Sequence, residues 1–147
     1  MIYKSADSEV MSSVRDRLHD TCILCGGKNP VGLKLRFEIM PDSGTRAEFT
    51  CSPIFEGYRG FMHGGVAASL MDSAMTNCLF AHNIAAFTAE MDIKYNLPVL
   101  CGKKAIVTAR IIEYLRPLYI LEAEIMQEGK TVVKAKAKFM ESELLKK

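Results

Sequence analysis

The feature that most constrains the fold of this chain is a long apolar run, 66–81, that follows a glycine-rich turn. Its apolar residues lie on nearly every side of a helical wheel, and such a helix belongs in a protein interior. Four polar residues interrupt the run at the spacing i, i+3, i+4 and i+7, which places them on one stripe: Ser69, Asp72, Ser73 and Thr76. A carboxylate on a narrow stripe of a buried helix is costly to keep charged, and groups in that state often serve chemistry.

The residues at the start of this helix support a catalytic interpretation. His63, Gly64 and Gly65 precede the apolar run. The first turn of a helix offers N–H groups without intrahelical partners and a partial positive charge, and glycine lets a ligand approach that backbone closely. Amides that stabilise an oxyanion, with Asp72 about two turns along the same helix, predict a catalytic pair. The alternative is that the stripe is simply the solvated side of an amphipathic helix.

Length and composition indicate a single globular domain, 1–147, in which residues 1–30 precede the core. The hydrophobic content of 49% is enough for a substantial core, and the net charge of +2, with scattered Lys and Arg, argues against nucleic acid as the main partner. We find no signal-peptide pattern and no uncharged apolar run of membrane-spanning length, so we expect no membrane partner. Five cysteines in such a chain predict reduced thiols and a cytoplasmic location.

Alternating apolar and polar residues predict six strands. They cover 33–39, 46–51, 87–96, 104–114, 118–127 and 133–139, and a short amphipathic helix covers 6–18. We expect the first two strands to form a hairpin and the last four a meander. An antiparallel sheet has one face to bury, which predicts an α+β fold with the sheet wrapped around the central helix. Apolar surface would stay exposed in a single chain, so we also expect a symmetric dimer or a larger assembly.

A second group of candidate residues, His19, Cys22 and Cys25, has a spacing typical of metal ligands. A structural zinc site needs a fourth ligand, and His63 or His82 could supply it only through the fold. Three interpretations stay open at this point: a loop without metal, a structural zinc site, and a redox-active cysteine pair.

From Cys22 onward the chain carries an ordered set of motifs at the predicted strand and helix positions. They are Cys-x-x-Cys-Gly with Asn29-Pro30 and Gly32-Leu33, Gly57-Tyr58-Arg59-Gly60, His63-Gly64-Gly65-Val66, Leu70-Met71-Asp72, Thr88-Ala89-Glu90-Met91 and Leu97-Pro98-Val99. In this set the chain resembles the hotdog-fold acyl-CoA thioesterases of the hydroxybenzoyl-CoA thioesterase superfamily, and in particular their phenylacetate-pathway branch. The resemblance implies about six antiparallel strands around one long helix, and hydrolysis of an acyl-CoA thioester with no cofactor required for catalysis.

The resemblance also implies roles for individual residues. Asp72 matches the carboxylate that acts as general base or nucleophile, and the backbone N–H of Gly64 or Gly65 matches the oxyanion donor. His63 matches a residue that holds this turn and the substrate carbonyl. Thr88 matches a hydroxyl that orients the attacking water, and in a dimer it would come from the other subunit.

An acyl-CoA substrate and a homodimer or dimer of dimers, with the site at the subunit interface, follow from the same resemblance. We expect the substrate to contact residues at the helix start, on its polar stripe and on the next strand: Phe61, Met62, Ser69, Ser73, Thr76 and Glu90. A non-catalytic acyl-CoA-binding or regulatory domain and a hotdog dehydratase are the competing functions. Asp72 favours hydrolysis over binding alone. A dehydratase would require a catalytic histidine aimed at the substrate, and His63 is the one nearby.

Overall fold

Helix α2 (Gly64–Ala81) forms where the apolar run predicts it and begins two residues earlier than expected. The computed structural model describes residues 5–146. The ring of His63 caps the helix, because its Nδ1 accepts the N–H of Gly65 at 2.9 Å. The helix ends at His82, and Asn83 follows it with a φ of 60°, a left-handed conformation common after helix ends. From Ser73 to Ala81 every residue is buried, as the apolar run predicts.

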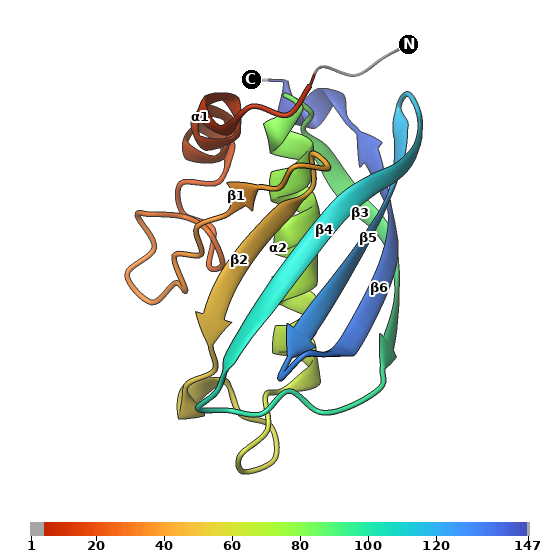
Figure 1. Ribbon diagram of the computed structural model, residues 1–147. Coiled ribbons are helices and arrows are strands. Elements are labelled where there is room, and N and C mark those ends of the chain that lie inside the picture. The colour runs from red at the N-terminus through yellow and green to blue at the C-terminus, as the bar shows by residue number, and fades with distance from the viewer. Residues whose placement is uncertain (1–4, 147) are drawn as a thin grey trace.

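Six strands form one antiparallel sheet that curls around α2 (Figure 1). They are β1 (Glu38–Ile39), β2 (Thr45–Thr50), β3 (Ala86–Tyr95), β4 (Lys104–Leu115), β5 (Leu118–Gln127) and β6 (Lys130–Glu141). Their order across the sheet is β1-β2-β4-β5-β6-β3. The helix-facing residues of β4, β5 and β6 are buried in alternation with less buried ones, as period-two patterning requires. The predicted α+β fold is confirmed.

The first predicted strand, 33–39, is much shorter than expected, since only Glu38 and Ile39 pair with β2. The alternating burial of this segment is present, but its backbone bonds go elsewhere. The N–H groups of Leu33 and Leu35 donate to carbonyls of the cysteine loop at 2.9 Å each, those of Ile23 and Leu24 respectively. The N–H groups that a strand would use for pairing are therefore already bonded to the cysteine loop.

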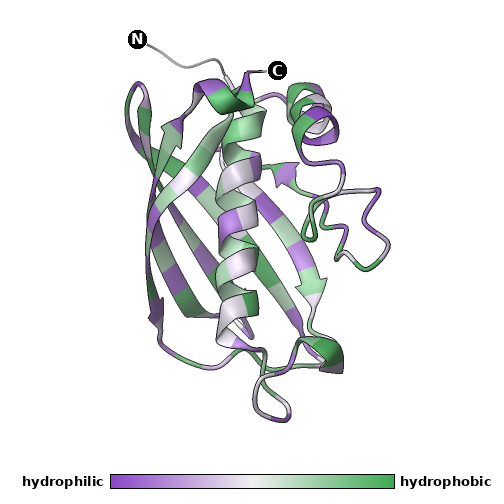
Figure 2. Cartoon of the chain, turned by 180° about the vertical axis from the view of Figure 1, so that it is seen from behind, coloured by the Kyte–Doolittle hydropathy of each residue, from purple (hydrophilic) through white to green (hydrophobic). Residues whose placement is uncertain are grey.

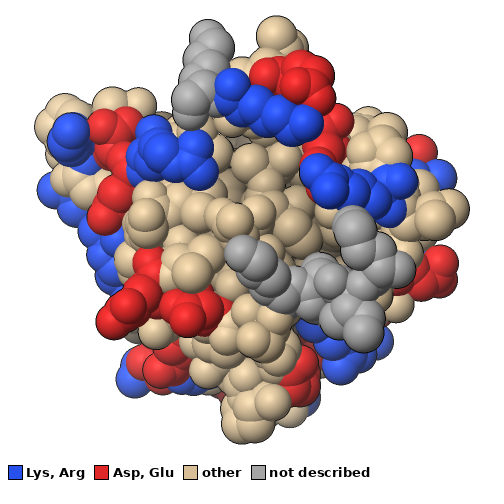
Figure 3. Space-filling view, turned by 90° about the horizontal axis from the view of Figure 1, so that it is seen from above, with Lys and Arg blue, Asp and Glu red and all other residues tan. Residues whose placement is uncertain are grey.

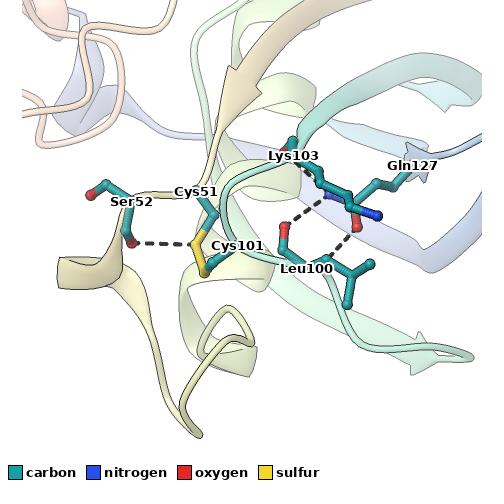
Figure 4. Close-up of a disulfide and its surroundings, with 6 residues drawn as sticks. All are labelled: Cys51, Ser52, Leu100, Cys101, Lys103 and Gln127. Atoms are coloured by element: carbon teal, nitrogen blue, oxygen red, sulfur yellow. Dashed lines mark hydrogen bonds between the residues drawn. A yellow bond between two sulfur atoms is a disulfide. The ribbon is translucent and has the colours of Figure 1, made fainter.

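The predicted meander is right for β4, β5 and β6 and wrong for β3. Strand β3 pairs with β6 at one edge of the sheet, and β4 pairs with β2. The connection 96–103 therefore crosses from one edge toward the middle of the sheet. The side chain of Gln127 holds this crossing, because its amide accepts from Leu100 N–H at 2.8 Å and donates to the carbonyls of Leu100 and Lys103 (Figure 4).

Helix α1 (Ser8–Leu18) lies beside the C-terminal part of α2 (Figure 1). Asp7 caps it by accepting N–H bonds from the first turn, so the helix starts two residues after the expected Ala6. Met11 and Val14 are its buried residues. At the other end of the chain, a short 3₁₀ turn covers Glu143–Leu145, and Lys147 lies outside the described residues. A second 3₁₀ turn, Pro53–Phe55, follows β2.

One side of α2 is not covered by another element over its first half, as the view from behind shows (Figure 2). Strand β3 is the edge of the sheet next to that side, so its outer edge pairs with no strand of the described chain. On the face seen from above, acidic and basic side chains form small separate groups around an area without charges (Figure 3). Within residues 5–146, no helix is long and apolar enough to cross a membrane.

A disulfide joins Cys51, just after β2, to Cys101 in the crossing connection (Figure 4). The expectation that all thiols are reduced is therefore wrong for this pair. The pairing of Thr50 with Lys104 brings the end of β2 next to the residues before β4, which leaves the two Cα atoms 4.6 Å apart. The other cysteines are free: Cys22, Cys25 and Cys78.

Because the disulfide closes a loop with a sequence separation of 50, it restricts the unfolded chain. We predict that Cys101→Ser lowers the free energy of unfolding by about 2–4 kcal/mol in non-reducing buffer. Urea denaturation followed by circular dichroism measures this. In reducing buffer, where the wild-type chain also lacks the bond, the difference should nearly vanish. An equal difference in both buffers would contradict the prediction.

Candidate active site

The acid predicted from the polar stripe, Asp72, lies half-buried on the side of α2 that faces β3. The hydroxyl of Thr88 on β3 donates a hydrogen bond of 2.5 Å to Asp72 Oδ1. The two residues thus meet within one chain, whereas the resemblance implied that Thr88 comes from the other subunit. The expected acid and hydroxyl are therefore already paired in a single subunit.

Thr88 reaches the helix because β3 carries a β-bulge. The register between β3 and β6 shifts between Thr88 and Glu90, which makes Ala89 the additional residue. Thr88 pairs with Phe139, which is fully buried, and beyond the bulge Met91 also pairs with a buried residue of β6. Paired side chains of neighbouring strands project on the same face, so both residues face the helix. Bulges commonly re-aim side chains near active sites in this way.

The same bulge places Glu90 on the opposite face of the sheet from Thr88. Strict alternation along 87–96 would place Thr88 and Glu90 on one face of the sheet. In the structure, Glu90 pairs with Lys138 and forms an ion pair with it, with Nζ and Oε2 3.6 Å apart, on the outer face. The contact of Glu90 with the substrate stays a prediction, and in the single chain its side chain lies on the opposite face of the sheet from Asp72.

Two hydrogen bonds that involve side chains hold the start of α2, and they determine which of its backbone amides remain free. Because Nδ1 of His63 accepts the Gly65 N–H, the neutral ring carries its proton on Nε2. The hydroxyl of Tyr95, on β3, donates to the carbonyl of Gly64 at 2.8 Å and ties the helix start to the sheet. The Gly65 amide is thus engaged in the cap. The Gly64 amide, at the first helical position, is the better candidate for an oxyanion donor.

A hollow of about 360 Å³ opens at this end of the helix, and it is lined by Gly57, Tyr58, Met62, His63 and Gly64. Met62 is nearly buried at 8% exposure, and Phe61 is exposed at 38%. The structure therefore brings His63, Gly64 and Met62 together at one opening and places Phe61 on the adjoining surface.

The polar stripe divides into two halves. Ser69 lies half-buried one turn before Asp72 and donates to the carbonyl of Gly65 at 2.9 Å. Ser73 and Thr76 are buried, with exposures of 6% and 7%. The first half of the stripe is therefore partly exposed, whereas the second half is enclosed by the protein itself.

The environment of Asp72 disfavours its charged form. Burial raises the pKa of this carboxyl, while the hydrogen bond from Thr88 and the positive charge on protonated His19 lower it, and the Cys22 thiolate raises it. Burial is the largest of these effects, so the pKa lies above the usual value of 3.8. A carboxylate with a raised pKa is a stronger base once it is ionised.

The three predicted metal ligands also gather in space. The ligand atoms of His19, Cys22 and Cys25 lie within 4.8 Å of one another. His63 and His82, considered as a fourth ligand, are not part of this group in the described chain. The hydrogen bond from Cys25, opposed by burial and aided by His19, lowers the pKa of Cys22 to about 3. The same bond, together with burial, raises the pKa of Cys25.

Burial and a raised thiol pKa argue against Cys78 as a nucleophile. Its side chain is fully buried among the core residues of α2, and burial raises the pKa of its thiol to about 12. A thiol in that state packs as a small hydrophobic group.

A family model described as the thioesterase superfamily matches residues 59–137. The match spans more than half of the chain, and the chain belongs to this superfamily. The matched region includes the turn before α2, the helix with Asp72 and the bulged strand β3. No curated protein matches the chain.

Solved structures share the fold. One thioesterase superfamily protein matches with a TM-score of 0.74 and 22% identity over 78% of this chain, and the chain spans 60% of its length. The PaaI protein from the phenylacetic acid degradation operon of E. coli matches with a TM-score of 0.69 and 21% identity, over 75% of this chain and 80% of that protein. The hotdog fold expected from the resemblance is thereby confirmed.

A third similar structure is a hypothetical thioesterase protein from Streptococcus pneumoniae TIGR4 with coenzyme A. It has a TM-score of 0.69 and 17% identity, over 74% of this chain and 88% of that one. Two further structures of a protein with the same description each carry one alanine substitution. One replaces an aspartate and the other replaces a threonine, and these two residues are sixteen positions apart.

Periodicity alone could find Asp72 but not the bulge, the His63 cap or the Tyr95 contact. A bulge changes which face a residue occupies without leaving a mark in the alternation.

We predict that Asp72→Asn raises the melting temperature at neutral pH. The raised pKa means that the charged carboxylate destabilises the folded state above that pKa, and the neutral amide removes this cost. Below the pKa of the unfolded chain the carboxyl is neutral in both states, so the gain should disappear in acid. Thermal unfolding of both proteins across pH measures the effect. A lower melting temperature for the variant at neutral pH would contradict it.

Proposed function

We propose that the protein hydrolyses an acyl-CoA thioester to a free acid and coenzyme A. The observation that carries this proposal is a half-buried acid, Asp72, bonded to Thr88 on the same side of the sheet as a capped, glycine-rich helix start. Thioester hydrolysis requires an acid with a raised pKa together with amide donors. Asp72 and Gly64 lie about 12 Å apart along one helix, so the proposed subunit interface would bring the acid of one subunit to the amides of the other. Membership of the thioesterase superfamily supports the proposed hydrolysis.

In the proposed reaction, the thioester carbonyl lies at the start of α2 of one subunit, and the acting Asp72 belongs to the other subunit of the proposed dimer. The Gly64 amide and the Nε2–H of His63 are the donors for the negative charge that develops on the carbonyl oxygen. Asp72 takes a proton from water as the oxygen of that water bonds to the carbonyl carbon. The tetrahedral intermediate then expels the coenzyme A thiolate, which takes the proton held by Asp72 and leaves the acid ionised again. If Asp72 instead attacks the carbon itself, water hydrolyses the resulting anhydride. The catalytic step uses protein groups and water, and no cofactor.

Thr88 is the proposed partner that holds Asp72 in place. Its hydroxyl donates to Oδ1, which favours the charged form of the acid, and Oδ2 is the oxygen that we propose acts on water. Asp72 and Thr88 are separated by sixteen positions. The substituted aspartate and threonine of the Streptococcus pneumoniae protein have the same separation, which supports the pairing as a functional one.

Coenzyme A is the proposed carrier group because a structure of that neighbour contains it. We further propose that the active form is a homodimer or a dimer of dimers, with the sites at the subunit interface. The unpaired edge of β3 supports this, and so do the apolar side chains near it, Phe87, Tyr95 and Leu97, with exposures of 48%, 53% and 46%.

We predict that Asp72→Asn reduces kcat about 10²–10⁴-fold, since loss of the base removes the step that activates water. Release of free thiol from a panel of acyl-CoAs measures the rate. Asp92→Asn is the matched control, because Asp92 lies on the outer face of the same sheet opposite Lys136. Near-full activity of the Asp72 variant would refute the assignment. Binding of acyl-CoA without turnover by the wild-type protein would instead support the non-catalytic alternative.

The hydrogen bond from Thr88 to Asp72 predicts how the rate of hydrolysis depends on pH. Hydrolysis requires ionised Asp72, so the rate should fall in acid with a midpoint above 3.8. Because the hydrogen bond from Thr88 lowers the pKa of Asp72, Thr88→Val should move that midpoint to higher pH. His19 and Cys22, the other groups that act on this acid, are unchanged in the variant.

Profiles of kcat/KM against pH for the wild type, Thr88→Val and Thr88→Ser test this. The Ser variant keeps a hydroxyl and should restore the wild-type midpoint. If Thr88→Val leaves the midpoint in place, the hydroxyl does not act through Asp72.

A further inference from the structure

The ligand atoms of His19, Cys22 and Cys25 are already spaced as a metal would hold them. Nδ1 of His19 and Sγ of Cys25 are 3.8 Å apart, and all three atoms lie within 4.8 Å of one another. Tetrahedral zinc, with bonds of about 2.3 Å to sulfur and 2.0–2.1 Å to nitrogen, places neighbouring ligand atoms about 3.5–3.8 Å apart. Only small shifts of the side chains would bring all three atoms to one ion.

The backbone between these residues is a tight turn that presents both sulfurs. Cys22 N–H donates to the carbonyl of His19 at 3.1 Å, and Gly26 N–H to that of Cys22 at 2.9 Å. A side chain at Gly26 would bring its Cβ to 2.4 Å from the Cys22 nitrogen, so the turn requires glycine. The N–H of Leu24 donates to Cys22 Sγ at 3.4 Å. Such outer bonds orient metal-binding thiolates and stabilise their charge.

An unpartnered hydroxyl points to the same place from α2. Ser73 is buried, with an exposure of only 6%, and its Oγ has no hydrogen-bond partner within the described residues. The side chains of Ser73 and Asn77 lie next to the sulfur of Cys25, which is itself fully buried. Buried polar groups rarely lack a partner, so this hydroxyl calls for an acceptor. A thiolate at Cys25, with its charge balanced by a metal, supplies that acceptor.

The imidazole of His19 is oriented by its neighbours. The residue follows the last turn of α1, and its ring packs edge-on against Phe80 with centroids 5.0 Å apart and an interplanar angle of 83°. This contact directs Nδ1 toward Cys25. The three ligands therefore come from the end of α1 and the loop after it, and all of them lie against the C-terminal half of α2.

The loop that holds these ligands is fixed by backbone bonds and a few buried side chains rather than by regular secondary structure. Residues 20–37 contain turns but no helix or strand, and two of their apolar side chains, Ile23 and Val31, are exposed at 58% and 74%. Loops of this length without secondary structure are uncommon in small domains. Metal binding supplies folding free energy to such segments directly.

We propose that His19, Cys22 and Cys25 bind one zinc ion, which joins the loop after α1 to helix α2. Two thiolates and one imidazole suit zinc better than calcium or magnesium, and they cancel its double charge in a partly buried place. The described chain brings three ligand atoms to the group, so water takes the fourth position. The site goes beyond the proposed hydrolysis, because no step of that reaction passes through the metal.

The test uses the full chain without a histidine tag. Zinc is measured by mass spectrometry of the metal after purification in reducing buffer without chelator and dialysis against metal-free buffer. We expect about one zinc per chain. Replacing zinc with Co²⁺ should then produce thiolate-to-cobalt charge-transfer absorption, which requires bound cysteine sulfur and needs no variant. Cobalt binding without that absorption, or no retention of either metal, would overturn the proposal.

Variants locate the ion. Cys22→Ala should lose nearly all zinc, while Cys78→Ala, which removes a buried free cysteine outside the group, should keep it. Zinc retained in full by Cys22→Ala refutes the ligand assignment. If Cys22→Ala does not fold, the cobalt spectrum of the wild-type chain decides. A Cys22–Cys25 disulfide in protein purified under reducing conditions, located by peptide mapping that distinguishes it from the Cys51–Cys101 bond, would favour the redox-pair interpretation and also overturn the site.

Discussion

Enclosing an apolar helix within a curled sheet is the constraint on which the rest of this structure depends. Helix α2 is apolar on almost all sides, so every exposed side of it costs free energy. The sheet covers one side, and α1 with its following loop covers the C-terminal half of another. The first half stays uncovered in the single chain, and this is where Asp72, Ser69 and the glycine-rich start lie. The candidate site therefore occupies the part of the helix that the chain leaves open.

The same geometry explains why an acid can be kept there. Complete burial would make the charge of Asp72 too costly, and full exposure would leave its pKa at the ordinary value. Half-burial raises the pKa, and the hydroxyl of Thr88 limits the rise by bonding to the charged form. That hydroxyl is available because one additional residue in β3 turns it toward the helix. A local irregularity of the sheet thus completes the electrostatics of the site.

The N-terminal segment is bound to the core by different means. Helix α1 packs through two buried apolar residues, whereas the loop after it relies on backbone bonds and on the cluster of His19 and two cysteines. Its contact with Ser73 falls one position after Asp72 on α2. The loop and the proposed active site therefore lie on adjacent faces of one helix, and each contributes to the surroundings of the other.

The sequence by itself determined the elements and the chemistry they carry. The long helix, the alternating strands, the isolated acid and the cysteine spacing all follow from local patterns of a few residues. Tertiary structure alone decided the strand order, the bulge that separates Thr88 from Glu90, the shortening of the first strand and the disulfide between Cys51 and Cys101. Each of these depends on which distant backbone groups find one another, and hydrogen bonds between residues far apart in the chain leave no periodic signal in it.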